Sequence, residues 1–280
     1  MTDLKPLSVP ALMRKYGLSA RKSLGQNFLL DETALERVVA AAEIPADATV
    51  LEIGPGLGSL TRHLARVAAH VVAVELDGDI LPALQEALGD AQNVTIIHGD
   101  ILQQEMAGLI DEPGYLVVAN IPYYITSAVI RHLLEAPVKP ARLVLTMQKE
   151  VAERICARPG DLSLLALSVQ VYGAPRPAAR IPAGAFYPPP KVDSVVLRVD
   201  LYAQPRIPED QLDAFFHLAK LAFAQKRKTL RNTLSAGLHW PPERAAALLA
   251  EAGIDPMRRA ETLSLDEWAQ IVSAFRRETL

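Results

Sequence analysis

The chain has 280 residues, half of them are apolar, and the formal net charge is −3 at pH 7. This length and apolar content are typical of a globular protein with one large domain and a smaller one. The chain carries neither a signal-peptide pattern nor the roughly 20-residue apolar run of a membrane span, so we expect neither export nor membrane insertion.

The cysteine and charge distribution narrow the class further. Cys156 is the only cysteine, which excludes an internal disulfide and fits a reducing, cytoplasmic location. The six histidines do not fall at zinc-ligand spacing, so we expect no metal site. Basic residues gather near the two chain ends, and the first 30 residues hold five Lys or Arg and one Asp. Such clusters are usually solvated, but beside a nucleotide-binding fold they become candidate polyanion contacts.

The first two elements predicted from the amino terminus are helices. One covers residues 11–16 and ends at Gly17, since glycine is common just after the last helical turn. The second follows Asp31, a favourable N-cap, and continues through Val39. The segment between them, residues 21–29, is basic, and its Gly and Asn residues favour a turn.

From residue 50 onward, short apolar runs alternate with helical patterns, which predicts an α/β doubly wound sheet with helices on both faces. The expected strands are residues 50–53, 71–74, 94–98, 116–119, 143–147 and 195–199. The pattern at 150–156 is helical, whereas that of 164–171 fits a buried helix or a strand equally well. Two prolines within 202–208 mark a linker, so we place a large domain at 1–204 and a small helical domain at 205–280.

Glycines and carboxylates follow three successive strands of this sheet. The first strand ends in a loop with glycines at 54, 56 and 58, where the backbone can approach a ligand at a helix amino terminus. Glu75 ends the second strand and could bind both hydroxyls of a ribose, and Asp100 after the third could accept from an adenine amine. Each carboxylate alone is more often a loop or cap residue, but together they predict a nucleoside pocket.

The glycine spacing also bears on the type of cofactor. A dinucleotide-binding fold needs the pattern Gly-x-Gly-x-x-Gly, and the position three residues after Gly56 is Ser59. The sequence therefore argues against a pyrophosphate cofactor, and it disfavours a nicotinamide-dependent oxidoreductase.

The apolar run of the fourth strand leads into Asn120-Ile-Pro122-Tyr123. In an open parallel sheet the ligand crevice lies beyond the carboxyl ends of the strands, so these residues would face a bound ligand. They also allow a plainer interpretation, with Asn120 as a helix N-cap, Pro122 in the first helical turn and Tyr123 in the core.

Together, Glu52-Ile-Gly54-Pro-Gly56-Leu-Gly58, Glu75, Asp100 and Asn120-Ile-Pro-Tyr123 resemble the motifs of class I S-adenosylmethionine-dependent methyltransferases that act on an exocyclic amine. Gly25-Gln-Asn27-Phe-Leu29 and Phe186-Tyr-Pro-Pro-Pro-Lys191-Val-Asp-Ser-Val195 narrow the resemblance. From about residue 15 to its carboxyl terminus, the chain is similar to the small-subunit ribosomal RNA adenine N6,N6-dimethyltransferases, the KsgA/RsmA family. Segment 158–164 departs from the family pattern, because it is shorter and more apolar.

The resemblance implies a class I, Rossmann-like methyltransferase fold. Its mostly parallel seven-stranded sheet has an antiparallel last strand, residues 195–199, that ends the sheet, and a small all-α domain follows. The resemblance also implies S-adenosylmethionine as methyl donor and no metal. The expected reaction is N6 dimethylation of two adjacent adenosines near the 3′ end of 16S ribosomal RNA, within an immature 30S subunit. We expect a cytoplasmic monomer linked to small-subunit assembly.

The resemblance also assigns roles to individual positions. The catalytic residues are expected to be Asn120, Pro122, Tyr123 and Phe186. The cofactor is expected to contact Asn27, Leu29, Gly54, Gly56, Glu75, Asp100 and Asn120. RNA is expected to contact Arg21, Lys22, Lys191, Lys226, Arg227, Lys228 and Arg231, and the sequence pattern places Arg227 and Arg231 one turn apart on a helix.

The expected chemistry depends more on geometry than on acid or base catalysis. The sulfonium methyl is already activated, whereas the adenine amine is a poor nucleophile because its lone pair is delocalised into the ring. If the Asn120 side-chain oxygen and the carbonyl of Ile121 or Pro122 accept the two N6 hydrogens, the lone pair turns toward the methyl group. Tyr123 and Phe186 would stack the base once it has left its helix.

Two other functions fit the same residues. One is another adenine N6-methyltransferase of this fold, which acts on large-subunit ribosomal RNA or on DNA. The other is a ribosome-assembly factor that acts mainly by binding immature RNA. The intact motif at residues 120–123 favours an enzyme over a factor that only binds.

Overall fold

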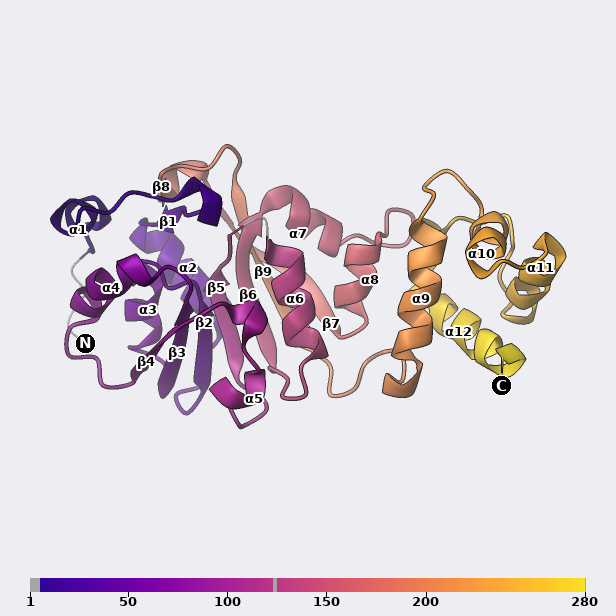
Figure 1. The fold of residues 1–280 in the computed structure, drawn as a ribbon, viewed down its shortest axis with the longest axis horizontal. Helices are drawn as coiled ribbons and strands as arrows, with labels where there is room; N and C mark the ends of the chain where they lie inside the picture. The colour runs from indigo at the N-terminus through magenta and orange to yellow at the C-terminus, as the bar shows by residue number, and fades with distance from the viewer. Residues whose placement is uncertain (1–5, 123–124, 280) are drawn as a thin grey trace. The chain divides into compact units, whose positions relative to one another are not determined.

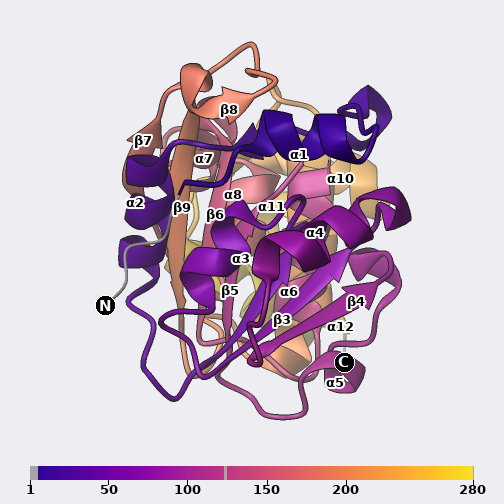
Figure 2. The ribbon, with the colours of Figure 1, turned by 90° about the vertical axis from the view of Figure 1, so that its left-hand side faces the viewer.

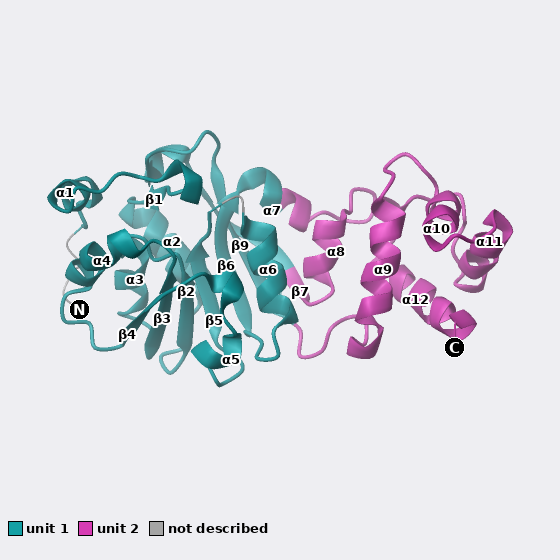
Figure 3. Cartoon of the chain, viewed as in Figure 1, with its two compact units in different colours: residues 1–152, 175–201 teal, residues 153–174, 202–280 magenta. Residues whose placement is uncertain are grey.

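The computed structural model describes residues 6–122 and 125–279. The chain forms two compact units, shown in Figure 3: Met1–Ala152 with Pro175–Leu201, and Glu153–Ala174 with Tyr202–Leu280. Residues 153–174 therefore belong to the helical unit, whereas the sequence-based division at residue 204 assigns them to the larger domain. Within the described residues, no helix is long and apolar enough to cross a membrane.

The first unit is built around a seven-stranded sheet (Figure 1). In spatial order its strands are β4 (Val94–His98), β3 (His70–Glu75), β2 (Thr49–Ile53), β5 (Leu116–Asn120), β6 (Arg142–Gln148), β9 (Ser194–Leu201) and β7 (Gly173–Ile181). The strands β2 to β6 pair in parallel, and β9 is antiparallel to β6. The predicted fold class, a mostly parallel seven-stranded sheet, is confirmed.

Two details of the sheet differ from the sequence-based prediction. The strand β9 is antiparallel as expected, but it does not end the sheet, because β7 lies outside it. The sequence pattern predicts no strand at β7, since Pro175 and Pro177 have no N–H group to donate to a sheet ladder. Both prolines are accommodated because β7 is an edge strand.

Helices cover both faces of this sheet. The helices α2 (Glu32–Ala42) and α3 (Ser59–Leu64) lie on one face, and α6 (Thr126–Glu135) lies on the other (Figures 1 and 2). The other helices that begin in this unit are α1 (Val9–Lys15), α4 (Leu81–Leu88), α5 (Met106–Leu109) and α7 (Lys149–Ile155). The inner parallel strands β2, β3, β5 and β6 are mostly apolar because they are buried on both sides, whereas the edge strand β4 is partly exposed.

Two short strands join the amino-terminal segment to a motif far along the chain. The strand β1 (Phe28–Leu29) pairs antiparallel with β8 (Phe186–Tyr187), and Leu29 lies opposite Phe186. Phe28 also packs in a core cluster with Leu57 and Ile80 and with residues of α1. These contacts hold residues 24–29 against the loops that follow the parallel strands.

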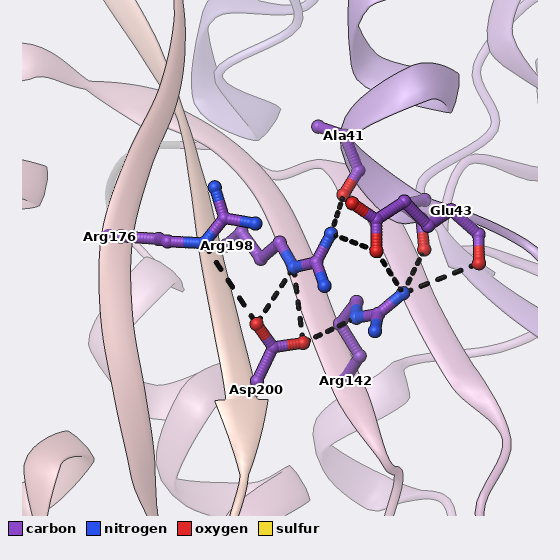
Figure 4. A network of polar contacts seen from close by, with 7 residues as sticks. Ala41, Glu43, Arg142, Arg176, Arg198 and Asp200 are labelled. Atoms are coloured by element: carbon purple, nitrogen blue, oxygen red, sulfur yellow. Dashed lines mark hydrogen bonds and ion pairs between the residues drawn. The ribbon is translucent and has the colours of Figure 1, made fainter.

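Charged side chains from β6 and β9 hold the carboxyl end of α2, and Arg176 of β7 contacts the same network through Asp200 (Figure 4). Arg198 donates to the backbone oxygen of Ala41 at 3.0 Å and pairs with Glu43 at 2.8 Å. Asp200 pairs with Arg198 at 2.8 Å and with Arg142 at 2.5 Å. Guanidinium groups at this end satisfy free helix carbonyls and complement the helix dipole, so Arg142 and Arg198 stabilise the fold.

The second unit is helical. It contains α8 (Leu164–Gln170), α9 (Leu212–Phe223), α10 (Leu230–Leu238), α11 (Pro242–Glu251) and α12 (Leu265–Thr279). Trp268 and Phe215 are fully buried at its centre, with ring centroids 6.1 Å apart. The segment 164–171, which periodicity leaves ambiguous, forms the helix Leu164–Gln170, and Ser163 caps its start: the Ser163 hydroxyl accepts the backbone N–H of Ala166 at 3.2 Å.

The basic stretch at residues 226–231 does not form one helix. The helix α9 ends at Phe223 and α10 begins at Leu230, so Arg227 lies in the connecting turn. The prediction that Arg227 and Arg231 lie one helical turn apart is wrong. Backbone hydrogen bonds from the start of α10 to the loop at residues 256–258 fix this boundary, and such long-range contacts are not visible in local periodicity.

Candidate active site

A pocket lies at the carboxyl edge of the parallel strands in the first unit. Residues that follow β2, β3, β4 and β5 form its wall together with residues 24–29. Eight predicted catalytic or cofactor-binding residues line it: Asn27, Leu29, Gly54, Gly56, Glu75, Asp100, Asn120 and Pro122. The fold thus brings separated motifs to one crevice, at the edge where open α/β sheets bind ligands.

The glycine loop after β2 allows a close approach between two parts of the wall. Gly56 has a φ of +59°, and a Cβ atom at this position would lie 2.9 Å from Cδ1 of Phe28. Glycine is therefore needed at position 56 for the left-handed backbone and for the contact with Phe28.

Glu75 is a buried carboxylate with a backbone donor on each oxygen. Its Oε1 accepts the N–H of Asp77 at 2.8 Å, and its Oε2 accepts the N–H of Gly56 at 3.0 Å. Burial raises the pKa of Glu75 above its usual value, and the backbone donors oppose that rise. Each oxygen keeps a second lone pair, so the ionised carboxylate can still accept from both hydroxyls of a ribose.

Asp100 has a capping contact and also a place in the pocket wall. Its Oδ1 caps a short helix by accepting the N–H of Leu102 at 3.0 Å, and the residue also lines the pocket. The apolar residues directly after the two carboxylates, Leu76 and Ile101, line the pocket as well. The sequence analysis missed both, although their places one residue past Glu75 and Asp100 could have identified them. An adenine ring fits between such apolar side chains.

The side chain of Asn120 is oriented by the amino-terminal segment. Its Nδ2 donates to the backbone oxygen of Asn27 at 2.9 Å. A carbonyl oxygen only accepts, so this bond fixes which end of the amide is nitrogen and leaves the Asn120 oxygen for a ligand. Asn120 does not cap α6, because that helix begins at Thr126 with Ile125 at its N-cap. The plainer interpretation of Asn120 as a helix cap is therefore wrong.

Glu52, at the end of β2, is the most deeply buried acid of the pocket wall. Burial raises the pKa of Glu52 to about 8, and the nearby Thr61 hydroxyl opposes the rise. Glu52 Oε2 and Thr61 Oγ1 are close, but neither has a partner of hydrogen-bonding geometry among the described residues. Glu52 therefore holds a proton at neutral pH in this state of the protein.

The charges of the pocket wall indicate which cofactor it suits. Its acidic side chains are Glu75 and Asp100, together with Glu52, which is protonated and uncharged at neutral pH, and its described lining residues include no Lys, Arg or His. A pyrophosphate would meet no positive charge here, whereas a nucleoside with sulfonium and ammonium groups would meet carboxylates. The residues of the wall thus fit S-adenosylmethionine, and the placement of Glu75 at the ribose and of Asp100 at the adenine amine stays a prediction.

Comparison with known proteins gives the family. The model of the family described as ribosomal RNA adenine dimethylase matches residues 17–277. The chain belongs to this family. It is therefore a ribosomal RNA adenine dimethylase, as the sequence motifs predict, and membership of a methyltransferase family implies S-adenosylmethionine as the methyl donor.

Relatives of similar length support the assignment to this family. Ribosomal RNA small subunit methyltransferase A of Dehalococcoides mccartyi (strain CBDB1) is 47% identical over 264 residues, which cover 93% of this chain and 90% of that protein. The protein of the same name from Moorella thermoacetica is 43% identical over 272 residues, which cover 93% of this chain and 94% of that protein.

Solved structures share the fold of the dimethylase family. The 23S rRNA methyltransferase ErmE is 29% identical with a TM-score of 0.71, and the match covers 89% of this chain and 100% of that chain. A dimethyladenosine transferase from Plasmodium falciparum has a TM-score of 0.78 at 24% identity, and the match covers 90% of this chain and 98% of that chain. The second likeness shows the fold alone.

The dimethylase resemblance implicates two aromatic residues, Tyr123 and Phe186, in stacking a base. Tyr123 falls outside the described residues, so its role stays a prediction. Phe186 is 3% exposed and packs in the core cluster that contains Leu29 and Val196. A stacking role for Phe186 also stays a prediction, and it requires the ring to become accessible. Its neighbour Tyr187 is 42% exposed.

The predicted RNA-binding residues of this dimethylase fall into two groups. Arg21, Lys22 and Lys191 belong to the first unit, whereas Lys226, Arg227, Lys228 and Arg231 belong to the second. Arg21 is engaged within the protein, since its guanidinium pairs with Asp77 at 2.6 Å and also with Asp79. The remaining six make no ion pair with a described residue. Their contact with RNA stays a prediction.

Proposed function

We propose that the chain uses S-adenosylmethionine to dimethylate N6 of two adjacent adenosines near the 3′ end of 16S ribosomal RNA. The observation that carries this proposal is the fixed amide of Asn120, which stands at the carboxyl end of β5 in a pocket suited to a cationic nucleoside. The printed names of the relatives, which specify the small subunit, support the choice of RNA.

The cofactor site is formed by the loops after the first three parallel strands. Glu75 accepts from the ribose hydroxyls, Asp100 accepts from the adenine amine, and Leu76 and Ile101 enclose the ring. The backbone of Gly54 and Gly56, together with Asn27 and Leu29, forms the rest of the wall. When bound, S-adenosylmethionine supplies an electrophilic methyl group, so this chain needs no strong base.

Asn120 prepares the attacking amine of the target adenosine. The amide nitrogen is held by Asn27, so the amide oxygen accepts one N6 hydrogen, and the carbonyl of Ile121 or Pro122 accepts the other. The Pro122 oxygen already accepts the N–H of Ile125 at 3.2 Å and the Thr126 hydroxyl at 3.5 Å, so it can accept an N6 hydrogen only if the Thr126 hydroxyl turns away. Two such acceptors turn the nitrogen lone pair out of the ring plane, and orientation provides most of the acceleration.

The basic residues of the first and second units recognise RNA backbone. Lys226, Arg227 and Lys228 are exposed in the turn before α10, where they can reach phosphates without losing an internal ion pair. The substrate is an immature 30S subunit, in which RNA is partly held in shape by proteins. The enzyme acts as a monomer in the cytoplasm.

The test is a methylation assay with defined substrates. The protein is incubated with methyl-labelled S-adenosylmethionine and with immature small subunits, large subunits or double-stranded DNA, and modified nucleosides are identified and mapped. The proposal predicts N6,N6-dimethyladenosine at two adjacent positions of 16S RNA. Label found only in large-subunit RNA or DNA would assign the chain to another adenine methyltransferase, and binding of small subunits without label would indicate an assembly factor.

A further inference from the structure

A chain of hydrogen bonds connects Glu75 to the segment that orients Asn120. Asp77 lies two residues after Glu75, and its backbone N–H donates to Glu75 Oε1 at 2.8 Å. The Asp77 carboxylate is only 2% exposed. A buried charge of this kind costs stability unless hydrogen-bond donors satisfy it, so the donors to the Asp77 carboxylate indicate its role.

Besides the backbone N–H of Asp79, which Oδ1 accepts at 3.3 Å, the partners of the Asp77 carboxylate come from the amino-terminal segment. Asp77 Oδ1 accepts from the Arg21 guanidinium at 2.6 Å, and Oδ2 accepts from the Gln26 side-chain amide at 2.8 Å. The Gln26 side chain is itself fixed, because its Oε1 accepts the backbone N–H of Arg21 at 2.8 Å. Asp77 thus holds both ends of a short basic turn, which the αL conformation of Gly25 closes at a φ of +61°.

The held turn ends at the atom that orients Asn120. Asn27 directly follows Gln26, and its side chain donates to the Gly25 oxygen at 3.1 Å. The backbone oxygen of Asn27 then accepts from Asn120 Nδ2 at 2.9 Å. If the turn shifts, this acceptor moves, and the Asn120 amide loses the bond that decides where its oxygen points.

We propose that Asp77 is a positioning residue for methyl transfer, which acts through residues 21–27 to fix the amide of Asn120. This inference rests on the proposed function, in which the Asn120 oxygen orients the attacking amine. Because the backbone of Asp77 also contacts Glu75, the same short network holds the cofactor carboxylate and the catalytic amide. Arg21 has a place in this network, and its predicted contact with RNA stays a prediction.

The test is a double-mutant cycle on the rate of methyl transfer in a single turnover, with saturating RNA and S-adenosylmethionine. Asp77→Asn keeps the size of the side chain and the backbone bond to Glu75, but it leaves only one oxygen for Arg21 and Gln26. We expect the rate to fall about 10-fold, on the scale of a misplaced catalytic group, and cofactor affinity to change less than about 3-fold. In an Asn120→Ala background, Asp77→Asn should reduce the rate less than about 2-fold, because the Asn120 amide through which Asp77 acts is already absent.

The matched control is Asp79→Asn, which removes the negative charge of an exposed partner of the same Arg21 and should change the rate less than about 2-fold. If Asp77 contributes to stability alone, Asp77→Asn should reduce the rate equally in the wild-type and Asn120→Ala backgrounds, or the folded molecules of the variant should methylate at an unchanged rate. Either result would overturn the proposal.

Hydrogen exchange gives a readout that does not depend on the reaction. In the cofactor-free protein, Asp77→Asn should speed exchange of the amides at residues 22–29 and leave β5 and β6 protected. Unchanged exchange in that segment would refute the positioning role. Faster exchange in Asp77→Asn, combined with a wild-type chain that methylates no adenosine, would instead show that the proposed function has failed while the network holds the turn as described.

Discussion

Glu75 is the residue at which cofactor binding and local stability can be separated most clearly. Each oxygen of its carboxylate accepts one backbone N–H, from Asp77 and from Gly56, and each keeps one lone pair for a ribose hydroxyl. An amide at this position has a single oxygen, and its NH₂ group would face one of the two N–H donors. Glu75→Gln should therefore lower the free energy of unfolding by about 1 to 3 kcal/mol, the cost of one buried donor without an acceptor.

The loss of cofactor affinity has a separate origin in the same substitution. A charge-assisted hydrogen bond to the ribose is lost, which corresponds to about 2 kcal/mol, or roughly a 30-fold rise in Kd. Calorimetric titration with S-adenosylmethionine measures the affinity, and urea unfolding measures the stability. Glu36→Gln, at an exposed position on α2, is the matched control and should change neither quantity. A folded Glu75→Gln protein with wild-type affinity would remove Glu75 from the cofactor site.

Two further predictions concern protonation and RNA. The native pKa of Glu52 is about 8 and the unfolded value is 4.5, so between these two pH values Glu52 is protonated in the folded protein and ionised in the unfolded chain. The free energy of unfolding should therefore fall as pH rises from 5 to 8. Glu52→Gln should flatten this slope by about 1.4 kcal/mol per pH unit in urea unfolding, and equal slopes would contradict a buried neutral Glu52. Replacing the basic residues of the turn and of α10 (Lys226, Arg227, Lys228 and Arg231) with Gln should weaken RNA binding and reduce its salt dependence, with cofactor affinity unchanged. An unaltered salt slope would assign these residues to a solvated surface.

The sequence predicts the elements that form the pocket because their signals are local. Apolar runs define the parallel strands, and the glycines, Glu75 and Asp100 stand directly at strand ends, where sheet geometry brings them together. The N-cap of α2 is visible as Asp31 for the same reason. Family resemblance then supplies the reaction, which the residue pattern alone narrows only to a nucleoside pocket.

The sequence does not predict features that depend on contacts between distant segments. The hydrogen bond from Asn120 to the Asn27 backbone joins residues 93 positions apart, and neither residue type signals it. Arg21 resembles any other basic surface residue until the fold places Asp77 beside it. The edge strand β7 is hidden by its two prolines, and the turn at Arg227 is set by backbone bonds to a loop late in the chain.

The central claim is that the Asn120 amide orients the attacking amine. Its most direct test is single-turnover methylation by Asn120→Ala, with thermal unfolding measured on the same sample. The account predicts a fall in rate of at least about 100-fold, the scale for losing one preorganised polar contact in a transition state, with RNA affinity unchanged. Stability should fall by no more than about 1 to 2 kcal/mol, because the lost bond is a single neutral one at a half-buried site. A stable Asn120→Ala protein that methylates at a near-normal rate would contradict the account.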